Sequence, residues 1–213
     1  MKVVCIVQAR MGSTRLPGKV LLPLNGRTVI GEVLSRCKRI PGVDEVVCAT
    51  TMLATDQVLA DEAAKYCKVV TGSENDVLWR YLYTAQLVGA DIIMRITGDC
   101  PLISPELCGE VLHLVTSGLH DYGSNIWPDR TFPKGLDCEA FTRKLLENAT
   151  VMATDPYERE HVTPWMQRNV PLVDIGVIKS PWPMEGRLCI DTQDDYNVIK
   201  AYFDEANQHL RAA

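Results

Sequence analysis

A stretch near the amino end, residues 3–19, decides the fold, and it reads VVCIVQARMGSTRLPGK. Its first part, Val3–Val7, is an unbroken apolar run, which predicts a buried strand. A long polar loop follows, because the next helical pattern begins only near Thr28. Long polar loops that leave a strand are where α/β proteins bind ligands. The sequence therefore places a candidate site directly after its first strand.

The loop of residues 8–19 is cationic. It contains Arg10, Arg15 and Lys19, together with two glycines and two hydroxyl side chains. Glycine lets backbone N–H groups approach a ligand closely, and the three cations can pair with phosphate oxygens. The first acidic residue of the chain is Glu32, although the net charge is −5. The positive potential is therefore local, and it predicts that this loop binds an anion such as a polyphosphate.

Two familiar phosphate motifs do not fit this loop. Five residues separate Gly12 from Gly18 where a Walker loop has four, and Val20 follows Lys19 where that motif needs serine or threonine. The spaced glycines of the dinucleotide fingerprint are also missing after the first strand. An ordinary solvated connection remains the alternative, and the charge of the loop favours the binding role.

Composition excludes several classes of protein. Hydrophobic residues make up 46% and charged residues 23% of the 213 residues, which is ordinary for one self-sufficient globular domain. No apolar run approaches the ~20 residues of a membrane span, and the amino end does not resemble a signal peptide, so we expect a cytoplasmic protein. The net charge of −5 argues against nucleic acid as the main partner.

The cysteines are scattered singly along the chain and match no zinc spacing. Several lie in apolar periodic runs, where cysteine behaves as a small hydrophobe. We therefore predict buried free thiols rather than a disulfide framework or a metal centre. The residues concerned are Cys5, Cys37, Cys48, Cys67, Cys100, Cys108, Cys138 and Cys189.

Strand and helix patterns alternate along the first half of the chain. Apolar stripes and caps predict helices at residues 28–38, 56–66, 73–88 and 105–115, and apolar runs predict strands at 46–49, 69–70 and 91–96. Ser104 is the expected N-cap of the fourth helix, and Gly89 the expected end of the third. Strands separated by helices of this length indicate an α/β fold with a mostly parallel sheet flanked by helices.

The second half is less regular. Residues 125–169 are rich in turn signals, with one predicted strand at 136–141, and a further strand is predicted at 187–190. Thr192 and Asp195 form a capping pair for a final helix. The apolar residues of this helix that are predicted to pack inward are Ile199, Tyr202, Phe203, Ala206 and Leu210. Outside the helix, Trp165 and Trp182 are expected to pack beneath the loops.

Polar residues end four of the predicted strands, at 8–10, 50–51, 97–99 and 191. Ligands bind beyond the carboxyl ends of the strands in such sheets. Two carboxylates brought together repel each other unless a cation lies between them, and Mg²⁺ prefers oxygen ligands and binds nucleotide phosphates. The pattern therefore favours a magnesium site at Asp99 and Asp191. The alternatives are a turn cap at Asp99 and a helix-start residue at Asp191.

The string QARMGSTRLPGKVLLPL, residues 8–24, resembles the nucleotide-binding signature of the CMP-sugar synthetases, the acylneuraminate and 3-deoxy-manno-octulosonate cytidylyltransferases. The resemblance is closest to their spore-coat polysaccharide branch. It spans nearly the whole chain, through DVLWRY at 76–81, RITGDCPLI at 95–103, YGSN at 122–125, FPKGLDCEAF at 132–141, REHVTPW at 159–165 and LCIDTQDDY at 188–196.

This resemblance implies the Rossmann-like nucleotide-diphospho-sugar transferase fold, as a single domain over residues 1–213. It implies that residues 125–169 leave the sheet to cover the acceptor and to contact a second copy in a homodimer. The related enzymes use the aspartates that match Asp99 and Asp191 as metal ligands, which supports Mg²⁺ there.

The resemblance also implies a role for each of the predicted site residues. Arg10, Arg15 and Lys19 are expected to neutralise a triphosphate and the departing pyrophosphate, as a catalytic set with Asp99. The remaining expected nucleotide contacts are Gly12 and Ser13 in the loop and, for the nucleobase, Gln8, Ala9, Thr50 and Arg80. For Arg80, an ion pair with Asp76 one helical turn earlier is the alternative.

Polar residues of the second half are the candidates for binding a hydroxylated acceptor. They are Asn125, Asp137, Glu139, Glu160 and His161. His161 could act as a base, but a lone histidine in a helix-like stretch is more often structural. Residues 159–161 form no catalytic triad, because the nearby serines and cysteines offer no nucleophile elbow.

The resulting prediction is a Mg²⁺-dependent cytidylyltransferase, in which an acceptor oxygen attacks the α-phosphorus of CTP and releases pyrophosphate. The acceptor is expected to be a sugar or sugar acid of a polysaccharide or glycan pathway. Three alternatives stay open: another nucleoside triphosphate, a glycosyltransferase that consumes a nucleotide-sugar, and a non-catalytic nucleotide-binding subunit. The last is disfavoured, because a pocket without turnover has no need of paired carboxylates.

Overall fold

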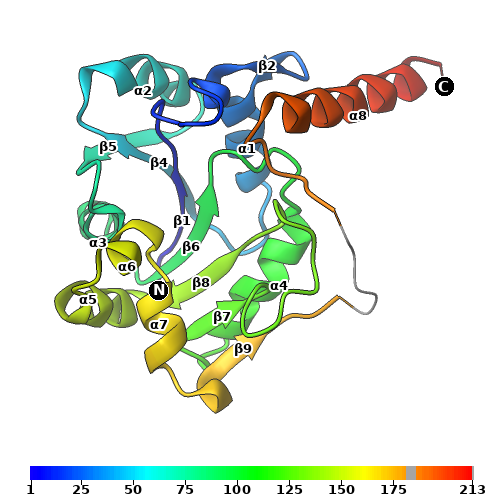
Figure 1. Cartoon of the computed structure of the whole chain (residues 1–213). Coiled ribbons are helices and arrows are strands. Elements are labelled where there is room, and N and C mark those ends of the chain that lie inside the picture. Colours follow the sequence, from blue (N-terminus) through cyan, green and yellow to red (C-terminus); the bar gives the residue numbers. More distant parts are fainter. Residues whose placement is uncertain (181–185, 213) are drawn as a thin grey trace.

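The computed structural model describes residues 1–180 and 186–212, and leaves out the side chains of Val173 and residues 207–212. Its centre is a seven-stranded sheet in the order β5-β4-β1-β6-β8-β7-β9 (Figure 1). The strands are β1 (Val3–Gln8), β4 (Glu45–Thr51), β5 (Lys68–Gly72), β6 (Ile92–Thr97), β7 (Tyr122–Ser124), β8 (Glu139–Thr142) and β9 (Ile175–Val177). Only β8 runs antiparallel to its neighbours. The predicted α/β class with a mostly parallel sheet is therefore confirmed.

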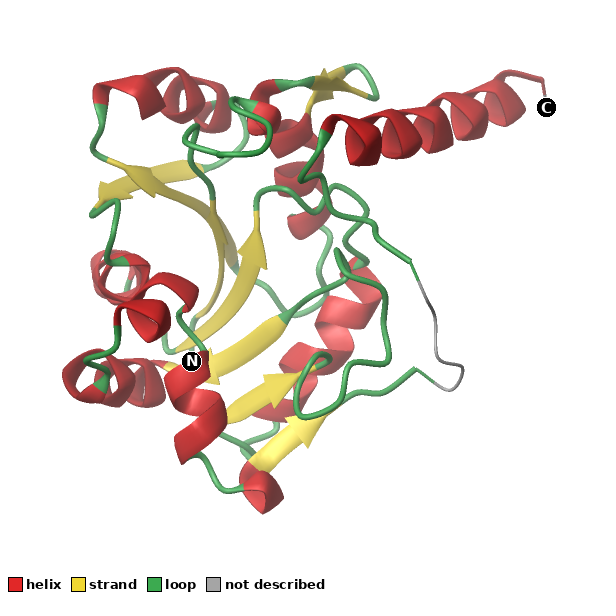
Figure 2. Cartoon of the chain, in the orientation of Figure 1, coloured by secondary structure: helices red, strands yellow, loops and turns green. Residues whose placement is uncertain are grey.

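Helices cover both faces of this sheet (Figure 2). The chain forms α1 (Val29–Cys37), α2 (Gln57–Ala64), α3 (Val77–Val88), α4 (Pro105–Thr116), α5 (Arg143–Met152), α6 (Pro156–His161), α7 (Pro164–Asn169) and α8 (Gln193–Ala212). A short hairpin, β2 (Pro23–Leu24) and β3 (Arg27–Thr28), lies beside α1. Val3, Cys5 and Val7 pack in one core with α1, α2 and α4, and Val4 and Ile6 pack in the other with α3 and α5. Burial on both faces explains why the first strand has no polar alternation.

The helix boundaries follow from their caps. Ser104 accepts a hydrogen bond from the Leu107 N–H at 3.2 Å, and Gly89, in the left-handed region at φ 68°, ends α3, as predicted. However, α3 begins at Val77 and not at the predicted Ser73, because the Asp76 side chain caps it by accepting from Trp79 N–H at 2.9 Å. All eight cysteines are free, and all but the half-buried Cys67 are buried.

Predictions for the second half were less accurate. The strand expected at 136–141 is β8 at 139–142, and it lies inside the sheet between β6 and β7. Residues 125–169 as a whole are therefore not an excursion from the sheet, since three helices and a sheet strand form within them. The strand expected at 187–190 is wrong, because this segment makes only an isolated bridge between Arg187 and Lys134.

The final helix, α8, leaves the body of the molecule, with its carboxyl end far from the sheet (Figure 1). The predicted capping pair forms, since Asp195 N–H donates to Thr192 Oγ1 at 3.2 Å and Thr192 N–H donates to Asp195 Oδ2 at 2.8 Å. Ile199 and Phe203 are buried as predicted. Tyr202 and Ala206 are exposed, which contradicts the prediction, because only one side of the first turns of the helix meets the core. The predictions for the side chain of Leu210 and for Trp182 fall outside the described residues.

Within the part of the chain that the structure describes, no helix combines the length and the apolar character needed to cross a bilayer. The predicted packing of Trp165 is found, since it lies partly buried against the core on the α3 side of the sheet.

Candidate functional site

A pocket with a cavity volume of about 360 Å³ opens at the carboxyl ends of β1 and β6. The loop that follows β1, residues 9–19, forms one wall, and α3 and α6 contribute to the other. Its lining comprises Gln8, Ala9, Arg10, Gly12, Ser13, Thr14, Arg15, Lys19 and Val20, then Val77, Arg80, Thr97, Gly98 and Asp99, and finally Glu160, His161 and Asp191. The structure therefore brings the cationic loop and both predicted metal ligands into one pocket.

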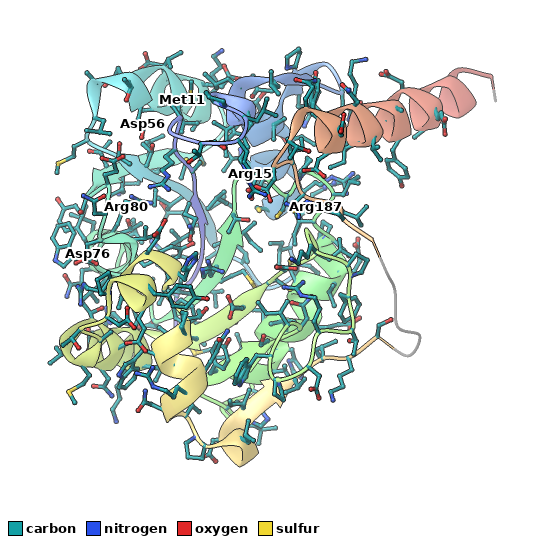
Figure 3. All side chains as sticks on the ribbon, viewed as in Figure 1. Met11, Arg15, Asp56, Asp76, Arg80 and Arg187 are labelled. Carbon is teal, nitrogen blue, oxygen red and sulfur yellow. The ribbon has the colours of Figure 1, made fainter. Side chains whose placement is uncertain are left out.

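The loop is anchored by contacts between its backbone and neighbouring residues. Met11 N–H donates to Asp56 Oδ1 at 2.8 Å, and the other carboxylate oxygen of Asp56 accepts from the Thr51 hydroxyl at the end of β4. Figure 3 shows Asp56 beneath Met11, on the side of the loop away from Arg15. Gly98 approaches so closely that a Cβ there would lie 2.8 Å from the Cβ of Ala9. The loop is thus anchored beside two strands, and its three cations, Arg10, Arg15 and Lys19, line the pocket.

Lys19 joins the two carboxylates. Its ammonium donates to Asp99 Oδ2 at 2.7 Å, to Asp191 Oδ1 at 2.8 Å and to the Ile190 carbonyl at 2.6 Å. The side chain of Lys19 is 10% exposed, and those of Asp99 and Asp191 are 24% and 17% exposed. A cation therefore does lie between the two carboxylates, and in this structure it is the ammonium of Lys19.

Cations surround both acids. Burial raises the pKa of Asp99, but the attraction of the Lys19 ammonium and hydrogen bonds from Lys19 and Thr97 outweigh it and hold that pKa below its usual value. Asp191 is paired with Arg15, whose Nη2 lies 2.9 Å from Asp191 Oδ1, and with Arg187. Figure 3 shows Arg15 and Arg187 pointing toward the same place from the loop and from the segment before α8.

The segment that carries Asp191 is positioned by contact with residues 134–135. Leu188 N–H donates to the Lys134 carbonyl at 2.6 Å, and Gly135 adopts φ +103° directly against the backbone of Leu188 and Cys189. A side chain at position 135 would collide with that backbone and would also meet an unfavourable φ. Gly135 therefore allows the close backbone contact that positions the segment carrying Asp191.

We expect Gly135→Ala to lower the free energy of unfolding by ~1–3 kcal/mol, the cost of a strained backbone residue, because the added Cβ would displace the segment that carries Asp191. Gly118→Ala is the matched control, because Gly118 has φ +76° but no atom within 4 Å of the added Cβ. Denaturant unfolding of the two variants checks this. Equal losses in both variants would show that the contact with Leu188 is unimportant.

Among the residues that the structure describes, two polar atoms of pocket-lining side chains have no hydrogen-bond partner. Gln8 Oε1 and Arg80 Nε are buried without a hydrogen bond, although Arg80 Nη1 donates to the Ser73 carbonyl. Arg80 is 1% exposed, and burial lowers the pKa of its guanidinium. The alternative ion pair with Asp76 does not form, because Asp76 Oδ2 accepts from Arg159 Nη2 at 2.6 Å and Nε at 2.8 Å. Both residues line the pocket, and because buried polar atoms normally have partners, these two atoms mark Gln8 and Arg80 as candidates for contact with a bound ligand.

Four residues predicted for the site do not line this pocket. Thr50 is fully buried, with its hydroxyl facing Asp56 at 3.5 Å. Asn125 is also fully buried and bridges the backbone of Leu136 and Cys138. Asp137 pairs with Arg130 through both carboxylate oxygens, and Glu139 is 1% exposed and bound to Arg95 at 2.8 Å. Because these polar groups are occupied by internal partners, their predicted roles in binding nucleobase or acceptor are not supported by this arrangement.

The other two predicted acceptor residues, Glu160 and His161, do line the pocket at the end of α6. Glu160 Oε1 lies 3.4 Å from Arg10 Nη2, so α6 and the loop after β1 meet across the pocket. The ring of His161 lies 4.4 Å from that of Tyr157, measured between centroids. Both side chains therefore remain candidates for contacts with an acceptor.

The sequence analysis placed Thr97 among the polar ends of the strands without giving it a role, and it missed Arg187 and Asp56. Thr97 donates to Asp99 Oδ1 at 2.7 Å, and Arg187 pairs with Asp191. Thr97 ends a predicted strand beside Asp99, so its position in the sequence was a usable signal. The contact of Arg187 depends on the path of the chain before α8, and Asp56 acts on a loop 45 positions away, so no local pattern reveals either role.

In an α/β sheet, a cationic loop that faces two carboxylates at the carboxyl edge is typical of nucleotide-binding proteins. A model of the cytidylyltransferase family matches residues 4–211 of this sequence. The chain belongs to the cytidylyltransferase family, and the resemblance to CMP-sugar synthetases found in its motifs is confirmed.

Two relatives match over nearly their whole length. An uncharacterised protein of Methanocaldococcus jannaschii is 36% identical over 99% of this chain and 88% of its own. The spore coat polysaccharide biosynthesis protein SpsF of Bacillus subtilis is 33% identical over 95% and 87% of the two chains. A 3-deoxy-manno-octulosonate cytidylyltransferase of Anaeromyxobacter is 32% identical over 55% of this chain and 48% of its own.

Solved structures show the same fold. A cytidylyltransferase from Leptospira borgpetersenii superposes with a TM-score of 0.89 at 38% identity, covering 94% of this chain and 86% of that one. A CMP-2-keto-3-deoxy-manno-octonic acid synthetase in complex with CTP superposes with a TM-score of 0.74 at 20% identity, covering 97% and 100%. The second comparison establishes the shared fold alone.

Proposed function

We propose that this protein transfers CMP from CTP to a hydroxyl of a sugar or sugar-acid acceptor and releases pyrophosphate. One observation carries the proposal: Arg15, Lys19, Asp99 and Asp191 meet at one edge of the pocket, although they come from three distant parts of the chain. The names of SpsF and of the 3-deoxy-manno-octulosonate cytidylyltransferase support a carbohydrate acceptor and a role in polysaccharide or glycan precursor synthesis.

The phosphates are assigned to the loop after β1. Arg10 and Arg15 have exposed side chains that line the pocket, so their guanidinium groups can reach phosphate oxygens without a change of the fold. Positioning and charge stabilisation supply most of the catalysis in transfers of phosphate-linked groups. Gly12 and Ser13 line the same wall. Ser13 N–H donates to the Met11 carbonyl at 2.8 Å, so the groups assigned to the phosphates are Gly12 N–H and the Ser13 hydroxyl.

The nucleobase is assigned to Gln8 and Arg80, the pair with orphaned atoms. Cytosine carries an amino group that can donate to Gln8 Oε1, and ring and carbonyl acceptors that can receive Arg80 Nε–H. Uracil presents a carbonyl where cytosine has its amino group. Gln8 Oε1 would then face another acceptor, so UTP should bind less well. Ala9, in the same pocket wall, leaves room beside Gln8.

The metal proposal rests on the donor set around Lys19. Two carboxylate oxygens and the Ile190 carbonyl surround one point, and hard oxygen donors of this kind suit Mg²⁺. Within the described residues no group of three or more His, Cys, Asp and Glu side chains could hold a metal, so any ion here would rely on these two acids. Asp99 and Asp191 would hold Mg²⁺, which would neutralise phosphate charge and polarise the bond to the leaving pyrophosphate.

We also propose a cytoplasmic homodimer. Eight free cysteines without a disulfide support a reducing compartment. The exposed Val198 and Tyr202 of α8 give a second copy an apolar surface to contact. Glu160 and His161 are proposed to face the acceptor, since α6 borders the pocket opposite the cationic loop.

Pyrophosphate release in the presence of Mg²⁺ and a panel of sugars and sugar acids tests the proposed function. We expect release with CTP and a carbohydrate acceptor, and little with UTP, GTP or ATP. Release only with another nucleoside triphosphate would contradict the assignment of Gln8 and Arg80. Consumption of a nucleotide-sugar without pyrophosphate release would identify a glycosyltransferase, and binding without turnover an accessory subunit.

A further inference from the structure

The ammonium of Lys19 is saturated. A lysine ammonium has three N–H donors, and all three are used by Asp99, Asp191 and the Ile190 carbonyl at 2.6–2.8 Å. The residue is 8% exposed, so water has little access to it. Lys19 therefore cannot contact a phosphate while it holds these three oxygens. Two predictions were made for this site: that Lys19 binds the phosphates and that a metal binds the two carboxylates. Both require the Lys19 ammonium to leave Asp99 and Asp191.

The charges around Lys19 are balanced. Three acids, Asp99, Asp191 and Asp195, contact three cations, Lys19, Arg15 and Arg187, so the cluster has a net charge of zero. The Arg187 Nε–Asp195 Oδ1 distance is 3.2 Å, and Asp195 is also bound to the backbone of Asp191 and Thr192. A divalent cation added to this cluster would meet a neutral site with an ammonium in its centre, so its attraction to the carboxylates would be opposed by repulsion at short range.

We propose that Lys19 is the resident cation of the Asp99–Asp191 site, and that a divalent cation replaces it there only when a nucleoside triphosphate accepts the released ammonium. This inference deepens the proposed function and rests on it for the identity of the nucleotide. Lysine suits the task, because its charge is compact and its four-carbon stem is flexible, whereas an arginine fork is fixed in shape. Metal and nucleotide therefore bind as a linked pair, and free Mg²⁺ binds weakly.

Removing the ammonium should expose the site to the metal. In Lys19→Met the cluster has three acids against two cations, a net charge of −1, and Asp99 loses the cation that it contacts. Unpaired carboxylates destabilise the folded protein, and a divalent cation that binds only the folded form restores stability. The variant should therefore melt at a lower temperature than the wild type and regain stability with Mg²⁺ alone.

Thermal melting with millimolar Mg²⁺ alone, CTP alone and both together tests the proposal. The wild type is expected to shift only with CTP and Mg²⁺ together, whereas Lys19→Met shifts by several degrees with Mg²⁺ alone. Lys38→Met, which removes an exposed lysine at the end of α1, is the matched control and should behave as the wild type. Lys19→Met with Asp99→Asn should lose the response to Mg²⁺, because one carboxylate of the site is gone.

Calorimetric titration of Mg²⁺ into the wild type covers the case in which Lys19→Met does not fold. No saturable binding is expected without CTP, and submillimolar binding of Mg²⁺ to the free wild type would overturn the proposal. A Mg²⁺ response of Lys19→Met no larger than that of the wild type would do the same. Neither measurement needs turnover, so failure of the proposed transfer reaction would be recognised separately, by the absence of pyrophosphate release.

Discussion

Asp99→Asn is expected to lower the rate of CMP transfer by at least ~10²–10³-fold, the usual cost of removing one group that stabilises transition-state charge. Asparagine keeps an oxygen that can accept from the Thr97 hydroxyl, which donates to Asp99 at 2.7 Å in the native protein, but it carries no charge. It therefore cannot balance Lys19 or hold Mg²⁺ as a carboxylate does. Pyrophosphate release measures the loss, and circular dichroism verifies that the fold is kept.

Asp61→Asn is the control for this variant. Asp61 lies on α2, where its carboxylate accepts from the exposed Gln57 side chain at 2.8 Å, so turnover should not change. A folded Asp99→Asn protein with wild-type turnover would remove Asp99 from both the metal site and the catalytic set.

Arg80→Lys is expected to lower kcat/KM for CTP by ~10–100-fold. This corresponds to the ~1–3 kcal/mol that is lost when a buried polar group has no partner. Lysine keeps the positive charge but has no N–H at the position of Nε, the atom that is buried without a partner in this structure. Since the nucleobase does not change during transfer, kcat should fall less than kcat/KM.

Selectivity separates a role in base recognition from a structural one. If Arg80 contacts the base, the ratio of kcat/KM for CTP to that for UTP should shrink in Arg80→Lys, whereas a merely structural role would lower both values equally and leave the ratio unchanged. Arg39→Lys, on the exposed surface after α1, is the control and should leave both values at the wild-type level.

The parts of the fold that sequence could predict are those fixed by neighbouring residues. β1 is recognisable from Val3–Val7 alone, and the caps at Thr28, Ser104 and Thr192 mark the starts of α1, α4 and α8 from hydrogen bonds within one turn. The place of β8 between β6 and β7 is not local, because it depends on pairing with strands up to 50 residues earlier in the chain, such as Ile92 with Thr142. The exposure of Tyr202 has the same cause, since the apolar stripe of α8 continues beyond the core that it contacts.

The same distinction explains the predictions of site residues. Loop residues 8–19 and Asp99 end adjacent strands of a parallel sheet, so their meeting follows from the fold class. Glu139 and Asn125 resembled ligand-binding residues because they are polar residues in the less regular second half of the chain. Their partners, Arg95 and the backbone of Cys138, are brought to them only by the assembled sheet. The saturation of Lys19 by three oxygens likewise becomes visible only in three dimensions.

A crystal structure of the protein with CTP and Mg²⁺, without acceptor, tests the central claim most directly. It should show the triphosphate along residues 10–19, the cytosine between Gln8 and Arg80, and the metal between Asp99 and Asp191 with the Lys19 ammonium moved to a phosphate oxygen. CTP bound elsewhere, or a metal held without either carboxylate, would contradict the account.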